Sequence, residues 1–204
     1  ILRCLVGSEM CIRDSINTDM IRNDKNNQVI DLGLSVLWAS KNMGDSLVGG
    51  YYSWGKLYQW ECENLYYWNF DNPINNICGN SDFDVVRYEY GKPWRLPTIS
   101  EFEELIQCCK WTWEEAGDIT PFMAGYKIYG PNGNHIFLPA AGYGHGTVRE
   151  ESYVTDQDIY GMYWSGNLSD DKAMSYELFF TRENICINQE WRSRGNSIRP
   201  VCAR

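Results

Sequence analysis

Tryptophan and tyrosine stand beside glycine at many places in this chain, as in GYY (residues 50–52), GYG (142–144) and GMYW (161–164). The 204 residues include 9 Trp and 14 Tyr. Both side chains combine a large apolar body with one polar group. Such a sequence favours a loop-rich β protein whose core is built from large side chains rather than from long regular elements.

A helix is predicted directly after the sequence WRLP at residues 94–97. Thr98 and Glu101 have the spacing of a capping box, and acidic residues occupy the first turns, where the helix dipole favours negative charge. Apolar residues then recur at i, i+3, i+4 and i+7 and define one buried stripe: Phe102, Leu105, Ile106 and Cys109. We expect this helix to end near Cys109 and to anchor the core.

A shorter helix and several strands complete the expected secondary structure. Residues 81–84 are expected to cap a helix that runs to Tyr90 and is followed by Gly91, a residue suited to the left-handed position after a helix. Two extended pieces broken at Gly33 are expected in residues 29–40, and Asn132-Gly133 predicts a hairpin. Strands are expected at 126–129, 135–138, 175–181, 185–189 and 197–202. This order indicates the α+β class.

The first 28 residues are not expected to belong to the fold. Residues 5–14 read LVGSEMCIRD, which is identical to one translated frame of an adapter used in transposase-based sequencing libraries, so residues 1–15 are interpreted as a scar. Residues 16–28 are polar and are interpreted as a linker. A single domain is expected over residues 29–204, and any signal or anchor segment is expected to be lost with the natural N-terminus.

Charge and cysteine content limit the partners and the compartment. A net charge of −9 without a basic run argues against nucleic acid and anionic membranes as partners. No apolar stretch approaches the roughly 20 residues of a membrane span. Of eight cysteines, Cys4 and Cys11 lie in the scar, which leaves six: Cys62, Cys78, Cys108, Cys109, Cys186 and Cys202. They form no Cys-x-x-Cys pair, so we expect an exported protein with at least one disulfide rather than a zinc site.

Seven motifs occur in a fixed order along residues 29–202: VIDLGLSVLWASKNMG, YYSWG, WRLPTISEFEELI, KWTW, GYKIYGPNGNHIFLPAAG, YWSG and NSIRPVC. Together they resemble the Fibrobacter succinogenes major paralogous domain family, which is typical of bacterial exported and surface lipoproteins. The resemblance implies a C-type-lectin-like fold: two short helices packed on twisted antiparallel sheets, long loops, and N- and C-terminal strands close together. It implies no particular ligand. Relatives often have cysteine at Lys41; if that cysteine pairs with the counterpart of Cys202, this chain lacks the bridge.

Catalysis is not predicted. The related formylglycine-generating enzymes bind copper through two closely spaced cysteines, whereas Cys186 and Cys202 are sixteen residues apart on different expected strands. Neither His135 nor His145 has an evident nucleophile partner, and no G-x-S-x-G motif occurs. No cofactor is expected, because acidic stretches such as GNSDFD lack the spacing of a calcium site.

The WRLP and IRP motifs each contain an arginine among apolar residues. We therefore predict that Arg95 and Arg199 are structural and pair with internal carboxylates, rather than clamping an external anion. The predicted structural residues are Trp94, Arg95, Thr98, Glu101, Phe102 and Arg199.

The candidate binding surface lies in the C-terminal half. In residues 175–181, Tyr176, Leu178 and Phe180 point to one face, and Ser175, Glu177 and Phe179 point to the other. One face must close the core, so the other is expected to face outward together with the loop 167–172. Trp and Arg, which are enriched in binding hot spots, follow in NQEWRSR. The predicted ligand-binding residues are Trp164, Asn167, Asp170, Tyr176, Asn188, Trp191, Arg192 and Arg194.

These residues predict a monomeric, non-catalytic recognition domain that binds a glycan or a protein. We expect it outside a bacterial cell, where it would be attached to a membrane only through the anchor segment that this chain has lost. An alternative is a retroelement-diversified binding protein; residues such as Lys172, Glu177 and Trp191 argue against it, because AAC-type codons do not give rise to them. A second alternative, an oxidoreductase like the formylglycine-generating enzymes, lacks the cysteine pair. Trp191 also has an alternative place in the core, beneath the final strand.

Overall fold

The computed structural model describes residues 28–46, 48–60, 74–117, 123–145 and 153–204. The segments interpreted as scar and linker lie outside these ranges, apart from Gln28 at the end of the linker. Within the described ranges, no helix is long and apolar enough to cross a membrane.

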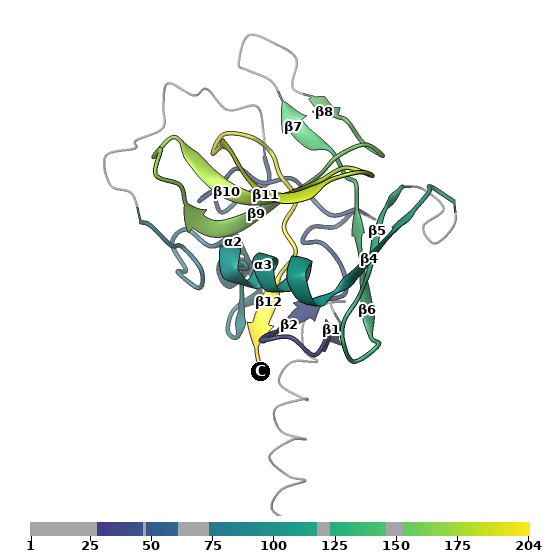
Figure 1. Ribbon diagram of the computed structural model, residues 1–204. Coiled ribbons are helices and arrows are strands. Elements are labelled where there is room, and N and C mark those ends of the chain that lie inside the picture. The colour runs from purple at the N-terminus through teal and green to yellow at the C-terminus, as the bar shows by residue number, and fades with distance from the viewer. Residues whose placement is uncertain (1–27, 47, 61–73, 118–122, 146–152) are drawn as a thin grey trace, which may run out of the picture.

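The two ends of the domain meet in one four-stranded sheet (Figure 1). Its order is β1-β2-β12-β3, formed by Val29–Ile30, Val36–Ala39, Val201–Ala203 and Trp94–Arg95. Val201 pairs with Trp38 on one side and with Arg95 on the other. The break between β1 and β2 contains Gly33 at φ +80°, a left-handed conformation that glycine adopts without strain.

Two three-stranded antiparallel sheets follow along the chain. The first consists of β4 (Lys110–Glu114), β5 (Gly125–Tyr129) and β6 (His135–Pro139). The turn between β5 and β6 contains the predicted Asn132-Gly133 pair, with Gly133 at φ +86°, so the expected hairpin is confirmed. The second sheet has the order β11-β10-β9, formed by Ile185–Trp191, Met174–Phe180 and Gly161–Leu168. A two-stranded ribbon, β7 (Tyr143–His145) and β8 (Tyr153–Thr155), lies beside it.

Both predicted helices are present. Helix α3 spans Ile99–Cys108, and the Thr98 side chain and Glu101 form the complete capping box. Helix α2 spans Val85–Tyr90 and ends at Gly91. The Asp84 carboxylate caps α2, and its second oxygen accepts hydrogen bonds from Gly79 N and Leu96 N, at 2.6 and 2.9 Å. One carboxylate therefore fixes α2 to the loop before it and to the strand after it.

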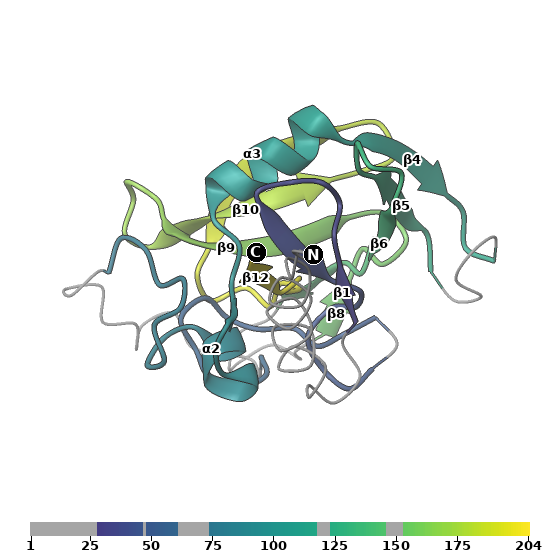
Figure 2. The same cartoon turned by 90° about the horizontal axis from the view of Figure 1, so that it is seen from below.

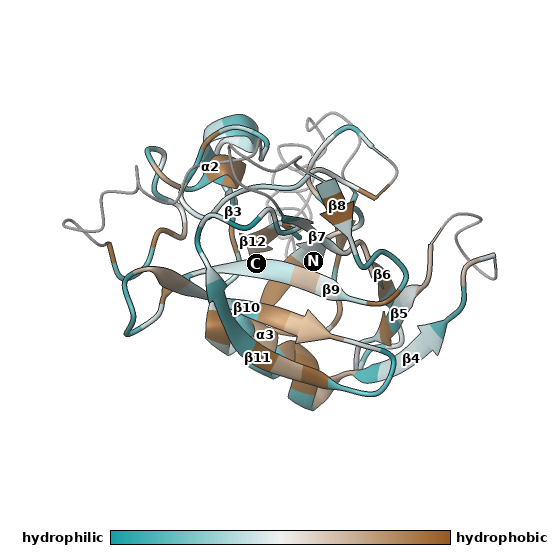
Figure 3. Cartoon of the chain, turned by 90° about the horizontal axis from the view of Figure 1, so that it is seen from above, coloured by the Kyte–Doolittle hydropathy of each residue, from teal (hydrophilic) through white to brown (hydrophobic). Residues whose placement is uncertain are grey.

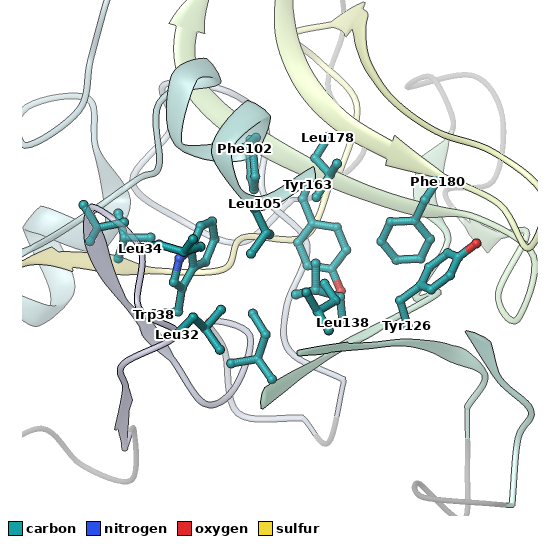
Figure 4. Packing of buried hydrophobic residues seen from close by; sticks show 14 of the residues in the cluster. Leu32, Leu34, Trp38, Phe102, Leu105, Tyr126, Leu138, Tyr163, Leu178 and Phe180 are labelled. Atoms are coloured by element: carbon teal, nitrogen blue, oxygen red, sulfur yellow. The ribbon is translucent and has the colours of Figure 1, made fainter. Parts of the chain in front are cut away.

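The four-stranded sheet separates two apolar clusters, with α3 on one side and α2 on the other (Figure 2). Strand alternation sends Val201 into the α3 cluster and its neighbour Cys202 into the α2 cluster. In the α3 cluster, Phe102 and Leu105 point toward Trp38 and Tyr163 (Figure 4). Phe102 is fully buried, as the stripe predicts.

The two motif arginines are structural, but their partners differ. Arg95 Nη1 donates to Glu101 Oε2 at 2.9 Å, which is the internal carboxylate expected for it. Arg199 is fully buried and donates to Asn42 Oδ1, Ala39 O and Phe137 O, at 2.9, 3.0 and 2.7 Å. The prediction that Arg199 pairs with a carboxylate is wrong, because three neutral oxygens accept hydrogen bonds from its guanidinium instead.

Antiparallel sheets and two short helices in the described ranges agree with the predicted α+β class. No disulfide is found among the described cysteines. Cys78, Cys108, Cys109, Cys186 and Cys202 are all free thiols, so no bridge joins any two of these five; Cys62 lies outside the described residues.

Candidate functional site

On the polar face of the β10–β11 hairpin, the two side chains that β10 contributes are buried. Ser175 pairs with Glu190 and Glu177 with Asn188, so these four side chains share one face of the sheet. Ser175 and Glu177 are both fully buried, so their face does not supply the outward surface expected of this hairpin. The chain after β11 folds back over this face, which a strand pattern read alone does not reveal.

Glu177 is held by two amides. Asn188 Nδ2 donates to its Oε1 at 3.2 Å, and Asn196 Nδ2 donates to its Oε2. Burial, and then the neighbouring carboxylate of Glu190, raise the pKa of the Glu177 carboxyl well above its ordinary value. Because Glu177 has no exposed surface, it cannot reach a ligand, and we assign it a structural role.

The opposite face of the hairpin divides into a buried part and an open part. Leu178 and Phe180 pack into the core beside α3, which crosses behind β10 and β11 in Figure 3. Tyr176, one of the predicted ligand-binding residues, lies half-buried on this face. Trp191 pairs with Met174 at the open end and is 42 % exposed. The core alternative for Trp191 is therefore wrong.

Residues 192–196 run between two other segments and are fixed by both. Trp54 N donates to Arg192 O at 2.9 Å, and Tyr52 exchanges two backbone hydrogen bonds with Asn196. On the other side, Gly144 exchanges two with Gly195. The Trp60 indole donates to Ser193 O at 3.0 Å. A Cβ on Gly144 would lie 2.6 Å from the Trp60 ring, which explains why glycine stands there.

This backbone places two arginines over aromatic rings. The Arg192 guanidinium carbon lies 4.7 Å from the centre of the Trp54 ring, and Nη1 donates to Lys172 O at 3.1 Å. The Arg194 guanidinium carbon lies 5.4 Å from the centre of the Tyr143 ring. Burial lowers the pKa of both groups, that of Arg192 to about 10, so the Arg192 guanidinium remains charged at neutral pH.

We call Glu190, Trp191, Arg192 and Arg194 the arginine corner. Glu190 Oε1 lies 3.6 Å from Arg194 Nε and accepts a hydrogen bond from Trp191 N at 2.7 Å. Burial raises the pKa of Glu190. Asp170, a predicted site residue, is exposed on the loop whose Lys172 carbonyl meets Arg192, so the structure brings this loop to the corner. Asn188 is exposed on β11, the edge strand that also carries Glu190 and Trp191.

Two predicted ligand-binding residues are not at the surface site. Trp164 is buried, and its indole donates to Tyr52 O at 2.6 Å. Asn167 Oδ1 accepts a hydrogen bond from Ile99 N at 3.0 Å, so it supports the start of α3. Trp164 therefore has a structural role, whereas ligand contact by the half-buried Asn167 stays a prediction.

Sequence reasoning missed Trp54 and Tyr143 as parts of the site. Tyr143 and Trp54 belong to the glycine-flanked aromatic stretches that mark this chain, but those stretches also supply buried residues such as Tyr52 and Trp164. The pattern alone does not separate the two groups.

The arrangement offers hydrogen-bond donors, a carboxylate and a flat apolar ring. In the part of the chain that the structure describes, no three His, Cys, Asp or Glu side chains lie close enough to hold a metal ion. Cys186 on β11 and Cys202 on β12 are separate free thiols. Comparisons with protein-family models, curated proteins and solved structures find no match for this chain.

Proposed function

We propose that this chain is a non-catalytic recognition domain that binds a glycan or a protein ligand through the arginine corner. The observation that carries the proposal is the pair of arginines held over Trp54 and Tyr143, in the segment that directly follows the exposed Trp191 in the sequence. Side chains that are ordered before binding lose little conformational entropy when they bind. Trp and Arg are also the residues that most often dominate binding energy.

The proposal includes a C-type-lectin-like fold of the kind that the Fibrobacter succinogenes major paralogous domain family implies, displayed as a monomer on the surface of a bacterium. The pairing of the N-terminal strand β2 with the C-terminal strand β12 supports this fold. The candidate surface lies on the β11-β10-β9 sheet and on residues 192–196, and this position in the C-terminal part of the chain also supports the proposed fold.

A binding screen tests the proposed function. Immobilised glycans and bacterial surface proteins are probed with the wild type, Trp191→Ala and Arg192→Ala, after circular dichroism has shown that all three are folded. We expect a ligand that the wild type retains and both variants lose. A ligand that all three retain equally would place the binding site elsewhere on the molecule.

A further inference from the structure

A pocket of about 250 Å³ lies beside helix α2 and shares no residue with the arginine corner. It opens between the turn at residues 43–45, the segment 57–59 and the C-terminal half of α2. Ligand sites for drug-sized molecules measure roughly 300–1,000 Å³. This pocket therefore suits a small group rather than a large molecule.

Apolar carbon forms the buried floor of the pocket, while polar atoms make up the larger part of its lining. Met43, Tyr52 and Val85 line it and are buried, and the half-buried Leu57 adds to the same surface. These side chains belong to the α2 core cluster, so the floor is part of the rigid interior. An apolar group that binds here is stabilised, because it removes the exposed carbon of these side chains from water.

The rim of the pocket is negatively charged. Asp45 and Glu89 both line the pocket and are exposed, and no Lys, Arg or His is among the lining residues that the structure describes. Burial, and then the nearby Tyr90, Glu89 and Asp45, raise the pKa of the Tyr52 phenol, which shows that the floor lies within the field of both carboxylates. An anionic ligand would be repelled by this field.

Aromatic rings complete the lining. Tyr58 and Tyr90 also line the pocket, and Tyr58 is 53 % exposed. The ammonium of Lys56, which is not a lining residue, lies 5.8 Å from the centre of the Tyr58 ring. This contact is within the range of a cation–π interaction, so the Tyr58 ring already attracts a cation of the chain itself.

We propose that this pocket binds an alkylammonium group, whose carbon atoms cover the Met43 and Val85 floor while its charged nitrogen lies between Asp45 and Glu89. The proposal is independent of the function of the arginine corner. The alkylammonium group can come from two sources. One is a small free amine or quaternary amine, and the other is the side chain of a lysine in another protein. The chemistry is the same for both, and the experiment separates them.

The experiment follows the Met43 methyl signal by NMR while choline chloride is added to the wild-type chain. A parallel titration uses 3,3-dimethylbutan-1-ol, in which carbon replaces the charged nitrogen. We expect saturable shifts with choline and binding at least about tenfold weaker with the alcohol, because the charge is lost at nearly constant shape. A third titration with Nα-acetyl-lysine methylamide identifies a lysine side chain as the source if it binds more tightly than choline.

Matched variants test the geometry. Asp45→Asn and Glu89→Gln should each weaken choline binding about threefold to tenfold, whereas Glu103→Gln on the exposed face of α3 should leave it unchanged. Lys56→Gln should strengthen binding, since it removes a competing ammonium. The proposal is overturned if neither choline nor the lysine derivative gives saturable shifts up to about 10 mM. It is equally overturned if Glu103→Gln weakens binding as much as Asp45→Asn, which would indicate attraction by the net charge alone.

Discussion

The guanidinium of Arg199 donates through Nε to the side-chain oxygen of Asn42 at 2.9 Å, and both side chains are buried. Asn42 Nδ2 in turn donates to the Tyr163 hydroxyl at 3.1 Å, and that hydroxyl donates to Pro139 O at 2.7 Å. The network joins β2, β6 and β9 through neutral acceptors. Because no carboxylate is among the acceptors of Arg199, burial lowers its pKa to about 10.

Replacement of Arg199 by lysine should destabilise the fold by about 3 kcal/mol or more. A lysine ammonium cannot reproduce the planar fork that meets three separate oxygens, and the groups that lose their partner are buried. Denaturant titration measures the loss, and Arg182→Lys is the control because the Arg182–Glu115 pair is exposed. A loss below about 1 kcal/mol for Arg199→Lys would show that the network is not a main support of the fold.

Truncation of Phe102 tests the core that helix α3 anchors. Phe102→Ala should lower the free energy of unfolding by about 3–5 kcal/mol, since the ring is fully buried against Trp38. The neighbouring exposed Glu103→Ala should change it by less than about 0.5 kcal/mol. Equal effects of the two substitutions in urea titrations would mean that the stripe is not core.

Glu177 predicts a pH dependence of stability with a defined sign. Its pKa in the folded state is raised, so the folded chain retains a proton that the unfolded chain releases near its ordinary pKa of about 4.3. The favourable contribution is complete below that pH and is lost as the pH rises through the folded-state pKa, by at most about 1.4 kcal/mol per pH unit. The Glu177→Gln variant should lack this loss and be more stable than the wild type at neutral pH.

Unfolding curves of wild type, Glu177→Gln and Glu103→Gln across acid to neutral pH measure this difference. Glu103→Gln should follow the wild type, because Glu103 is exposed. A Glu177→Gln variant that follows the wild-type pH profile would disprove the raised pKa of the buried carboxyl.

The described cysteines should differ sharply in reactivity. Cys108 is exposed, whereas burial raises the pKa of Cys202 to about 11 and that of Cys78 to about 12. Alkylation requires the thiolate, so brief iodoacetamide treatment at neutral pH should label Cys108 and spare Cys202 until the chain unfolds. Peptide mass mapping distinguishes the sites; early labelling of Cys202 would contradict its burial.

Local signals in the sequence were sufficient for α2, α3 and the β5–β6 hairpin. A capping box, an aspartate cap and an Asn-Gly turn each specify their own few residues, so long-range packing did not have to be known. Strand β9 gave no such signal, because residues buried on both faces of a strand do not alternate.

The candidate site was only partly predictable for the same physical reason. Trp191 and Arg192 were found from residue type, but the burial of Trp164 and Glu177 depends on segments distant in sequence that cover them. The stacking of Arg192 on Trp54 joins residues 138 positions apart in the chain, and no local pattern specifies that contact.

The proposed function of the arginine corner is tested most directly by the dissociation constant of the ligand that the screen identifies. Arg192→Ala should raise this constant at least about tenfold, as expected for a hot-spot residue, while Arg182→Ala, an exposed arginine outside the corner, should leave it unchanged. Melting curves of both variants establish that the fold is intact. An Arg192→Ala variant that melts like the wild type and binds with an unchanged dissociation constant would contradict the account.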